Sequence, residues 1–182
     1  MREDILIDIA RKAIAEKLYG KKMLDREGLI ERYPELKEKR AVFVTLNKRK
    51  ELRGCIGSII AHRALVDDIV ENARAAAFGD PRFVPLRPDE YENIEIEISI
   101  LTPPQELVYT DIDDLRKKIR KGVDGVILNV NGRQATYLPS VWEQLPDFDI
   151  FFSTLCQKAG LPGSCLQMHP VIYVYQAQKI HE

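Results

Sequence analysis

One six-residue stretch of the sequence carries the side chains best suited to chemistry. Leu52-Arg53-Gly54-Cys55-Ile56-Gly57 places a guanidinium, a thiol and two glycines in a run that otherwise has the pattern of a buried strand. A nearby cation favours the thiolate form of a cysteine, so Arg53 is expected to lower the pKa of the Cys55 thiol and make it a candidate catalytic nucleophile. A nucleophile also needs a base, and His62 and His169 do not lie at a recognisable motif spacing. The alternative is that Cys55 is a small buried residue packed under a helix, as free cysteines usually are.

Strand alternation predicts which way these side chains point. Successive residues of a strand face opposite sides, so Arg53, Cys55 and Gly57 should share one face, with the first two roughly 6–7 Å apart. The side chains assigned to the core are those of Leu52, Ile56 and Ile60. Gly54 and Gly57 would weaken a plain strand, which indicates a bulge, a close approach of another backbone, or a ligand that reaches the main chain.

A second candidate site is electrostatic. Asp80 and Arg82 lie in a rigid loop with two prolines, which follows the helix that the motif strand leads into. Glu95 and Glu97 lie on a later strand and could face Arg53. Such a cluster over a glycine-opened strand would suit a small polar ligand or the tail of a partner, whereas the alternative is a structural ion pair that pins the loop to the sheet. The residues predicted to bind are Arg53, Gly54, Gly57, Asp80, Arg82 and Glu97.

The cysteines indicate a reducing environment. Cys55, Cys156 and Cys165 are odd in number and far apart, and no signal peptide precedes them. We therefore predict no disulfide and a cytoplasmic location. Together with His62 and His169 the cysteines lack the spacing of a zinc site, so no metal and no cofactor are predicted.

Composition bounds the class of partner. The chain has 27 Lys and Arg against 28 Asp and Glu, and a nucleic-acid binder needs an excess of basic residues on one face. No apolar run approaches the length of a membrane span. One group of aromatic residues has acidic neighbours, which favours core packing over base stacking: Tyr137, Trp142, Phe148, Phe151 and Phe152.

Hydrophobic periodicity locates the elements that must position these residues. The predicted helices are 5–19, 61–78, 140–145 and 148–159, with a short helical turn at 88–91. A further helix is predicted to be capped by Thr110 with Asp113 and to end at 121. The predicted strands are 41–46, the motif strand, 94–101, 125–130, 133–138 and 171–178. The segment that contains Gly28 and Tyr33-Pro34 is expected to be a connection with at most a short helical turn.

These elements predict an α+β fold. An antiparallel sheet, built from strands near Phe43, Cys55, Ile98 and Val174, should be flanked by the two long helices. Thr102-Pro103-Pro104 breaks the pattern. We therefore predict a larger subdomain, 1–105 plus 166–182, and a smaller inserted helix–hairpin–helix subdomain, 106–165.

Six motifs occur in the order and at about the spacing of one known family: Leu52–Gly57, Asp80–Phe83, Ser99–Pro103, Gly122–Leu128, Ala135–Pro139 and Leu155–Gly160. On these motifs the chain resembles the AMMECR domain family, named after a human chromosomal region deleted in a syndrome that includes Alport syndrome. The first motif is the family's hallmark. It is followed here by Ser58-Ile59, where many members carry a threonine and an aromatic residue.

The resemblance implies two α+β subdomains, the smaller inserted in the larger. It also implies a shared pathway with a Memo-like protein and a radical S-adenosylmethionine protein, which often accompany or are fused to prokaryotic members. Three functions follow as expectations. The chain is a binding or regulatory module that works with these proteins; or it is an enzyme acting on a small polar substrate at a pocket of Cys55 and Arg53; or, as suggested for other members, it is a nucleic-acid-linked regulatory factor. We favour the module, because the sequence shows no complete catalytic constellation.

Overall fold

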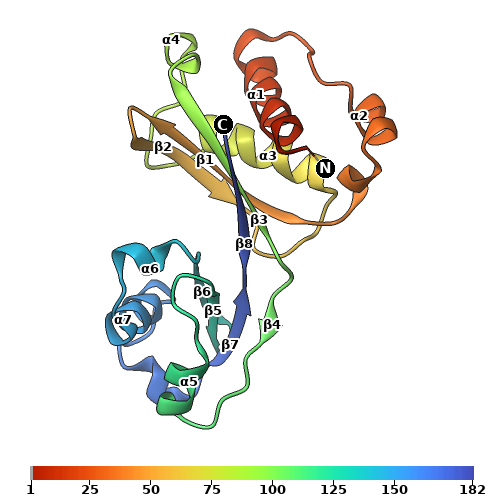
Figure 1. The fold of residues 1–182 in the computed structure, drawn as a ribbon. Coiled ribbons are helices and arrows are strands. Elements are labelled where there is room, and N and C mark those ends of the chain that lie inside the picture. The colour runs from red at the N-terminus through yellow and green to blue at the C-terminus, as the bar shows by residue number, and fades with distance from the viewer. Residues whose placement is uncertain (1) are drawn as a thin grey trace. The chain divides into compact units, whose positions relative to one another are not determined.

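The computed structural model describes residues 2–182, and contacts divide the chain into two units (Figure 1). The first contains the described residues up to Pro103 together with Gln178–Glu182, and the second is Pro104–Ala177. Each unit has its own four-stranded antiparallel sheet and its own hydrophobic core. The predicted α+β class is therefore confirmed.

The first unit consists of a sheet and two long helices. Its elements are α1 (Glu3–Tyr19), α2 (Arg26–Arg32), η1 (Pro34–Lys37), β1 (Ala41–Lys48), β2 (Glu51–Gly57), α3 (Leu65–Phe78), α4 (Pro88–Tyr91), β3 (Ile94–Leu101) and β8 (Ala177–His181). The strands lie in the order β2-β1-β3-β8, so β2, which carries the hallmark, is an edge strand. The turn between β1 and β2 places Arg49 and Lys50 at positive φ, as the common two-residue hairpin turn requires.

The core of the first unit lies between the sheet and the helices α1 and α3. On β1, every second side chain is fully buried against these helices: Val42, Val44 and Leu46. Both helices contribute an apolar stripe at helical spacing, which is why each covers the sheet with one side only. The opposite face of the sheet carries Phe43, Thr45 and Cys55, all of intermediate exposure.

The second unit is built around a cluster of aromatic side chains. Its elements are β4 (Gln105–Glu106), α5 (Ile112–Lys118), β5 (Gly125–Val130), β6 (Arg133–Tyr137), α6 (Val141–Gln144), α7 (Phe148–Lys158), η2 (Cys165–Met168) and β7 (Val171–Tyr175), and its strands lie in the order β4-β7-β5-β6. The rings of Trp142 and Phe151 stack with centroids 3.6 Å apart. Four of the five aromatic residues singled out in the sequence are buried and the fifth, Tyr137, packs against them. Core packing is thus confirmed for this group.

The terminal strand differs from the prediction. The segment 171–178 was expected as one strand of the main sheet near Val174, but β7 pairs with β4 and β5 in the second sheet. A separate strand, β8, follows after Gln176 and completes the first sheet. Only Gln176 separates the two strands, and no glycine or proline marks a turn there, so the sequence alone predicts one strand. The second unit consequently extends from 104 to 177 rather than from 106 to 165.

Two local predictions are also wrong. The segment expected to be mainly a connection contains α2, a seven-residue helix whose first turn is capped by the Asp25 carboxylate, which accepts from the Gly28 amide. The cap of α5 is Asp111, not Thr110: its carboxylate accepts from the Asp114 amide at 2.8 Å. In both cases an aspartate directly before the helix provides the capping oxygen.

The expectation of no disulfide is overturned. Cys156, near the end of α7, and Cys165, at the start of η2, form a disulfide with Cα atoms 5.8 Å apart, and both are fully buried. The chain turns back between them after α7, where Gly160 adopts a φ of 77° that favours glycine. Cys55 is the remaining free thiol. Because disulfides are rare in reducing compartments, the cysteine count no longer supports a cytoplasmic location. None of the described helices is long and apolar enough to cross a membrane.

Candidate functional site

A β-bulge at Arg53 shapes the hallmark strand. The register of β1 and β2 shifts between Leu46, which lies opposite Gly54, and Asn47, which lies opposite Leu52. Arg53 is therefore the extra residue of β2, and a bulge of this kind reverses the alternation of side chains beyond it. The prediction that Leu52 lies in the core is wrong, because 43% of its surface is exposed. Ile60, at 62% exposure, is likewise outside the core, whereas Ile56 packs against it.

The bulge directs the Arg53 side chain into a buried ion pair with Glu90 of α4. Arg53 Nε donates to Glu90 Oε1 at 3.0 Å, and Nη2 donates to Oε2 at 3.1 Å. Nη2 also donates to the carbonyl of Val84 at 2.8 Å, and the Phe83 ring lies 5.8 Å from the guanidinium carbon. Both side chains of the pair are less than one-tenth exposed. The Arg53 guanidinium, with smaller help from Lys48, lowers the pKa of Glu90 to about 2.

Cys55 is not activated by Arg53. Its Sγ lies 3.2 Å from Thr45 Oγ1 on the neighbouring strand, and the thiol is half-buried. Burial raises the pKa of the Cys55 thiol, and neither the Thr45 hydroxyl nor the positive charge of Arg82 lowers it enough to compensate. The cation near the thiol is thus Arg82 rather than Arg53, and Cys55 is a neutral thiol near pH 7.

The loop of Asp80 and Arg82 closes the outer edge of β2. The Asp80 carboxylate accepts from the Cys55 amide at 3.0 Å, and Arg82 Nη2 donates to the Cys55 carbonyl at 3.4 Å. The two side chains also pair with each other, with Arg82 Nε and Nη2 at 3.0 and 2.8 Å from the two Asp80 oxygens. These hydrogen bonds, the Arg82 side chain foremost, hold the pKa of Asp80 well below its usual range. The loop satisfies backbone groups that an edge strand would otherwise expose.

Glu97 belongs to a different arrangement from the one expected. It lies opposite Thr45 on β3, and Thr45 lies opposite Cys55, so the three side chains form a row across three strands. On β8, the ammonium of Lys179 and Nδ1 of His181 lie 3.7 and 3.2 Å from the Glu97 carboxylate. We call Cys55, Thr45, Glu97 and His181 the polar row. Glu97 contacts Lys179 and His181, and Arg53 pairs with Glu90 instead.

The two glycines of the hallmark are required by packing. A Cβ atom on Gly54 would lie 2.1 Å from the backbone oxygen of Ala76 in α3, because the helix approaches the strand closely there. A Cβ on Gly57 would lie 2.2 Å from the ring of Phe43, which rests on the bare backbone. Of the three reasons that the sequence offered, the close approach of another backbone accounts for Gly54, which also follows the bulged Arg53. Gly57 has a reason that was not among them, the side chain of Phe43.

Sequence reasoning missed Glu90, Thr45 and Val84. Glu90 follows Pro88 in α4, and its Oε2 also accepts from the Arg87 amide at 3.0 Å. Proline at the first position of a helix with glutamate two residues later is a recognisable helix start, so the sequence held a signal for a capping role. The sequence held no signal for the ion pair of Glu90 with Arg53, since the two residues are 37 positions apart.

The polar row offers hydrogen-bonding groups to a ligand, but it does not contain a nucleophile paired with a base. Neighbouring strands lie about 4.8 Å apart, so His181 is roughly 14 Å from Cys55 across three strand spacings. His62 is exposed, and its Nδ1 lies 3.1 Å from the carbonyl of Ile60. A base must come within hydrogen-bonding reach of the thiol, and among the described residues the Cys55 sulfur contacts the Thr45 hydroxyl rather than an imidazole.

Comparisons with known proteins extend the resemblance to nearly the whole chain. The AMMECR1 family model matches residues 7–180. A protein of Methanothermobacter thermautotrophicus is 41% identical over 180 residues, which cover 97% of this chain and 92% of that protein. A Methanopyrus kandleri protein is 40% identical over 188 residues, with coverage of 98% and 87%. The crystal structure of an uncharacterised protein from Pyrococcus horikoshii matches with a TM-score of 0.86 at 35% identity, covering 98% of this chain and 90% of that one.

The hallmark glycines should differ in their tolerance of alanine. Gly54→Ala is expected to lower the free energy of unfolding by about 1–3 kcal/mol, because the new methyl meets backbone that cannot move aside. Gly57→Ala should cost less, since the Phe43 ring can rotate. Urea unfolding of both variants checks this, and a Gly54→Ala protein as stable as the wild type would refute the close approach of α3.

Acid should weaken the fold through Glu90. Its pKa falls from 4.5 to about 2 on folding, so its contribution is complete above pH 4.5 and is lost as the pH falls towards 2. Glu90→Gln should abolish this part of the pH dependence and, by leaving Arg53 buried and unpaired, cost about 3–5 kcal/mol near pH 7. Unfolding by urea between pH 7 and pH 3 measures both effects. The control is Glu95→Gln, which changes an exposed carboxylate of β3. Equal acid sensitivity of the Glu90→Gln protein and the wild type would contradict the ion pair.

Proposed function

The chain belongs to the AMMECR1 family, and on that premise we propose that it is a binding module whose hallmark strand and 80–86 loop recognise a partner protein. The partner that we propose is a Memo-like protein, because the family resemblance implies a pathway shared with such a protein and with a radical S-adenosylmethionine protein. The observation that carries the proposal is the exposure of large apolar side chains around the hallmark.

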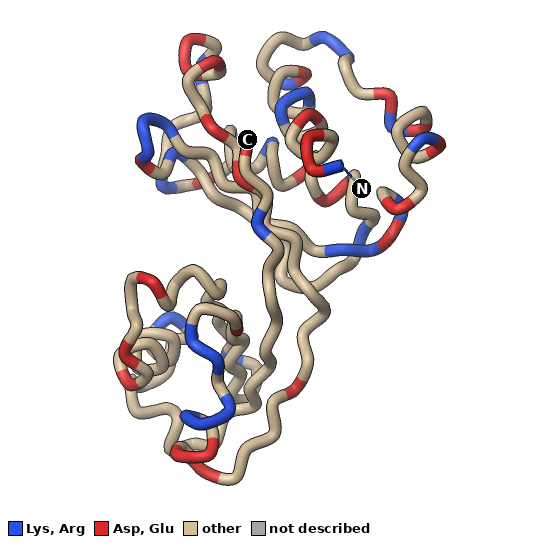
Figure 2. Tube along the Cα trace, in the orientation of Figure 1, with Lys and Arg blue, Asp and Glu red and all other residues tan. Residues whose placement is uncertain are grey.

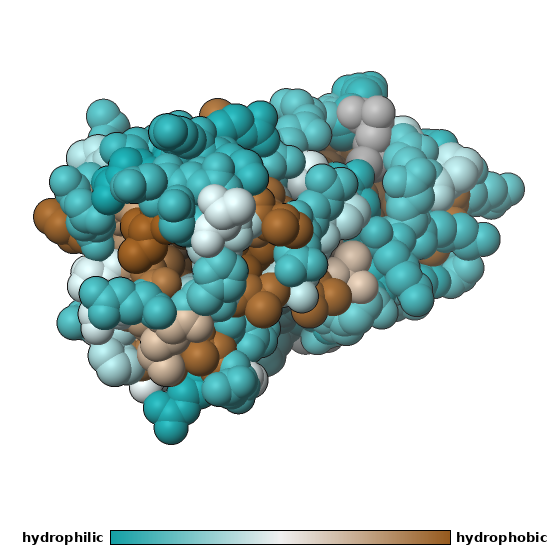
Figure 3. Space-filling view, turned by 90° about the horizontal axis from the view of Figure 1, so that it is seen from below, coloured by the Kyte–Doolittle hydropathy of each residue, from teal (hydrophilic) through white to brown (hydrophobic). Residues whose placement is uncertain are grey.

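Three large apolar side chains are exposed at or next to β2. Leu52 is 43% exposed, Ile60 62% and Val84 68%. Exposed apolar side chains that gather beside polar groups are characteristic of protein interaction sites. Hydrophobic side chains also reach the surface singly among hydrophilic ones in the view of Figure 3, and single ones need no functional explanation. Leu52 directly precedes Arg53, whose guanidinium binds the Val84 carbonyl, whereas Ile60 lies beyond the other end of β2. We therefore define Leu52 and Val84 as the β2 patch.

The β2 patch is held in place by the buried pairs beneath it. Leu52 directly precedes the bulged Arg53, and the carbonyl of Val84 accepts a hydrogen bond from that guanidinium at 2.8 Å. The loop that carries Val84 is tied to the edge of β2 through Asp80. Binding at a surface that is already ordered loses less conformational entropy, which favours affinity.

The other two functions have less support. A catalytic role for Cys55 needs a thiolate and a base, but burial raises the pKa of the thiol and the imidazoles lie elsewhere. A role in nucleic-acid binding needs a continuous basic surface. Figure 2 shows instead that each unit carries both basic and acidic residues, in keeping with a net charge of −1.

Substitutions in the β2 patch should weaken binding of the Memo-like protein. We expect Leu52→Asp and Val84→Asp each to raise the Kd by about tenfold or more, because each places a charge where an apolar contact forms. Isothermal titration calorimetry with the purified Memo-like protein of the same genome measures the effect. Val108→Asp is the matched control, since Val108 is 73% exposed in the second unit. Equal affinity for all four proteins, or no binding by the wild type, would refute the proposal.

The thiol should react slowly with alkylating reagents. Cys55 is the one free cysteine, so iodoacetamide labelling of the unreduced protein reports on it alone. Because burial raises its pKa, the folded protein should react roughly tenfold or more slowly at pH 7.5 than the urea-unfolded chain. Mass spectrometry follows the reaction, with Cys55→Ala as the blank. Faster labelling of the folded form would reveal an activated nucleophile and favour the enzyme over the binding module.

A further inference from the structure

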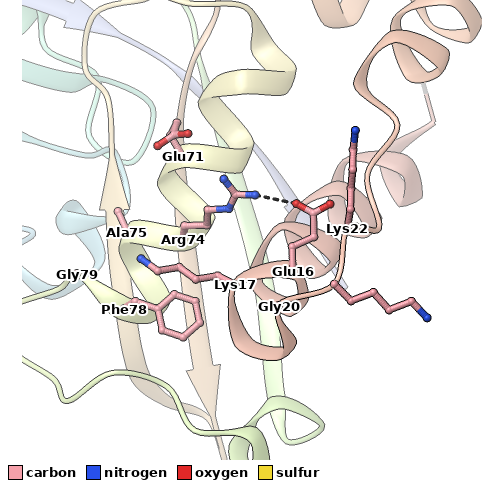
Figure 4. A pocket seen from close by; sticks show the side chains of 10 residues that line it. Glu16, Lys17, Gly20, Lys22, Glu71, Arg74, Ala75, Phe78 and Gly79 are labelled. Atoms are coloured by element: carbon pink, nitrogen blue, oxygen red, sulfur yellow. Dashed lines mark hydrogen bonds and ion pairs between the residues drawn. The ribbon is translucent and has the colours of Figure 1, made fainter.

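A second surface, on the helix side of the first unit, has the features of a binding groove. Two adjoining hollows of about 680 and about 290 Å³ lie beside α3 and the end of α1. Glu16, Lys22 and Arg74 line both hollows, so we treat them as one feature, the α1–α3 groove; Figure 4 shows its larger part. It shares no residue with the β2 patch.

The groove exists because the chain leaves α1 abruptly. Gly20 adopts a φ of 69° and ends the helix, and the following residues up to α2 form no regular secondary structure. The Glu16 carboxylate accepts from the amides of Met23 and Leu24 at 2.6 and 2.7 Å, which fixes this segment beside α1. One wall of the groove is therefore built by hydrogen bonds and does not need a ligand to form.

The charges in the middle of the groove cancel. Arg74 Nη2 donates to Glu16 at 2.8 Å, as the dashed line in Figure 4 shows, and Arg74 Nε donates to the carbonyl of Ala13 at 3.2 Å. The amides of Leu24 and Met23, together with Arg74, lower the pKa of Glu16, so this carboxyl is ionised near pH 7. Arg74 and Glu16 thus satisfy each other.

Three lysines remain along the groove with no carboxylate partner. Lys17, Lys21 and Lys22 are exposed, and none forms an ion pair with any residue that the structure describes. The ammonium of Lys17 lies 5.1 Å from the centroid of the Phe78 ring. The negative end of the α1 dipole accounts for Lys17 in its last turn, but the dipole effect does not extend to two further lysines beyond the cap. The exposed Glu71 also lines the larger hollow, so the cations Lys17, Lys21, Lys22 and Arg74 outnumber the carboxylates Glu16 and Glu71 there. This excess of positive charge stands out on a chain whose net charge is −1.

The smaller hollow is apolar. Its apolar lining consists of Leu24, Leu29, Val66 and Val70. The charges at this end are neutralised, because Arg26 Nε donates to Asp67 at 2.8 Å. The groove therefore offers unpaired cations at one end and apolar side chains at the other.

We propose that the α1–α3 groove binds an acidic, amphipathic helical segment of a partner protein. Its apolar side chains would occupy the hollow between Leu24 and Val70, and its carboxylates would pair with Lys17, Lys21 and Lys22. An amphipathic helix presents the two kinds of side chain on one face at the required spacing. A small free anion would use the lysines alone and leave the apolar hollow empty, and a basic segment would be repelled.

Synthetic peptides test this proposal directly. A fluorescein-labelled peptide of about 16 residues, with Leu at helical i, i+3, i+4 and i+7 positions and Glu elsewhere, should bind the full-length protein in a fluorescence anisotropy assay. Replacing its Glu by Lys, or its Leu by Ser, should weaken binding by about tenfold or more, since each change removes one of the two recognition features. Both changes leave the protein untouched, so its folding does not enter the comparison.

Protein variants locate the site. The triple variant Lys17→Glu, Lys21→Glu and Lys22→Glu should weaken binding of the acidic peptide by about tenfold or more, and binding should fall with added salt. The control is Lys50→Glu, Lys117→Glu and Lys121→Glu, which changes net charge equally at exposed lysines elsewhere and should bind as the wild type does. The proposal fails if the two triple variants bind alike, if the serine peptide binds as tightly as the leucine peptide (an anion site only), or if no binding occurs at about millimolar peptide.

Discussion

The buried pair of Arg53 and Glu90 is the interaction on which the hallmark region depends. An arginine can be placed under a loop only if its charge is matched, and the bidentate contact with Glu90 provides that match. The bulge in β2 is the local distortion that turns Arg53 towards α4 instead of the sheet face. The same guanidinium holds the Val84 carbonyl, so strand, loop and short helix are joined at one side chain. Removing Glu90 would leave Arg53 buried and without a carboxylate, and removing Arg53 would leave the buried Glu90 with Lys48 alone. The hallmark arginine therefore has a structural role whatever the region binds.

Some of this region could be predicted from the sequence, and the limits have physical causes. Apolar alternation and a polar turn were enough to predict the β1–β2 hairpin, and the glycines correctly indicated a bulge and a close approach. Alternation assumes one residue opposite one residue, however, so it could not show that Arg53 leaves the face of Cys55. The partner of Arg53 is set by the folding of the 80–91 segment back over β2, and no local pattern encodes that contact. The loop of Asp80 and Arg82 was expected at the same end of the strand, and there it lies.

The errors outside the site have a related origin. The disulfide between Cys156 and Cys165 depends on a turn at Gly160, whereas the prediction considered only the number and separation of the cysteines. Strands β7 and β8 are separated by Gln176 alone, with no turn residue between them, yet they belong to two sheets. In both cases the residues involved behave as their types suggest. The local sequence does not show which distant segment each of these residues contacts in the fold.

Cys55 has a different role in the folded protein from the one that its sequence neighbours suggest. Next to an arginine in the sequence it indicates a reactive thiolate, but in three dimensions it lies beside a threonine and under enough protein to stay protonated. Its backbone, rather than its sulfur, makes the charged contacts, through Asp80 and Arg82. A small, half-buried side chain at this position lets the loop come close to the edge of β2.

The order of the strands also bears on how the chain is made. β8 completes the first sheet, but a ribosome synthesises it only after the whole of the second unit. Until then the β3 edge of that sheet has no neighbour. Because β7 ends at Tyr175 and β8 begins at Ala177, both sheets receive their last strand at almost the same moment of synthesis, although the other strands of the first sheet are made much earlier.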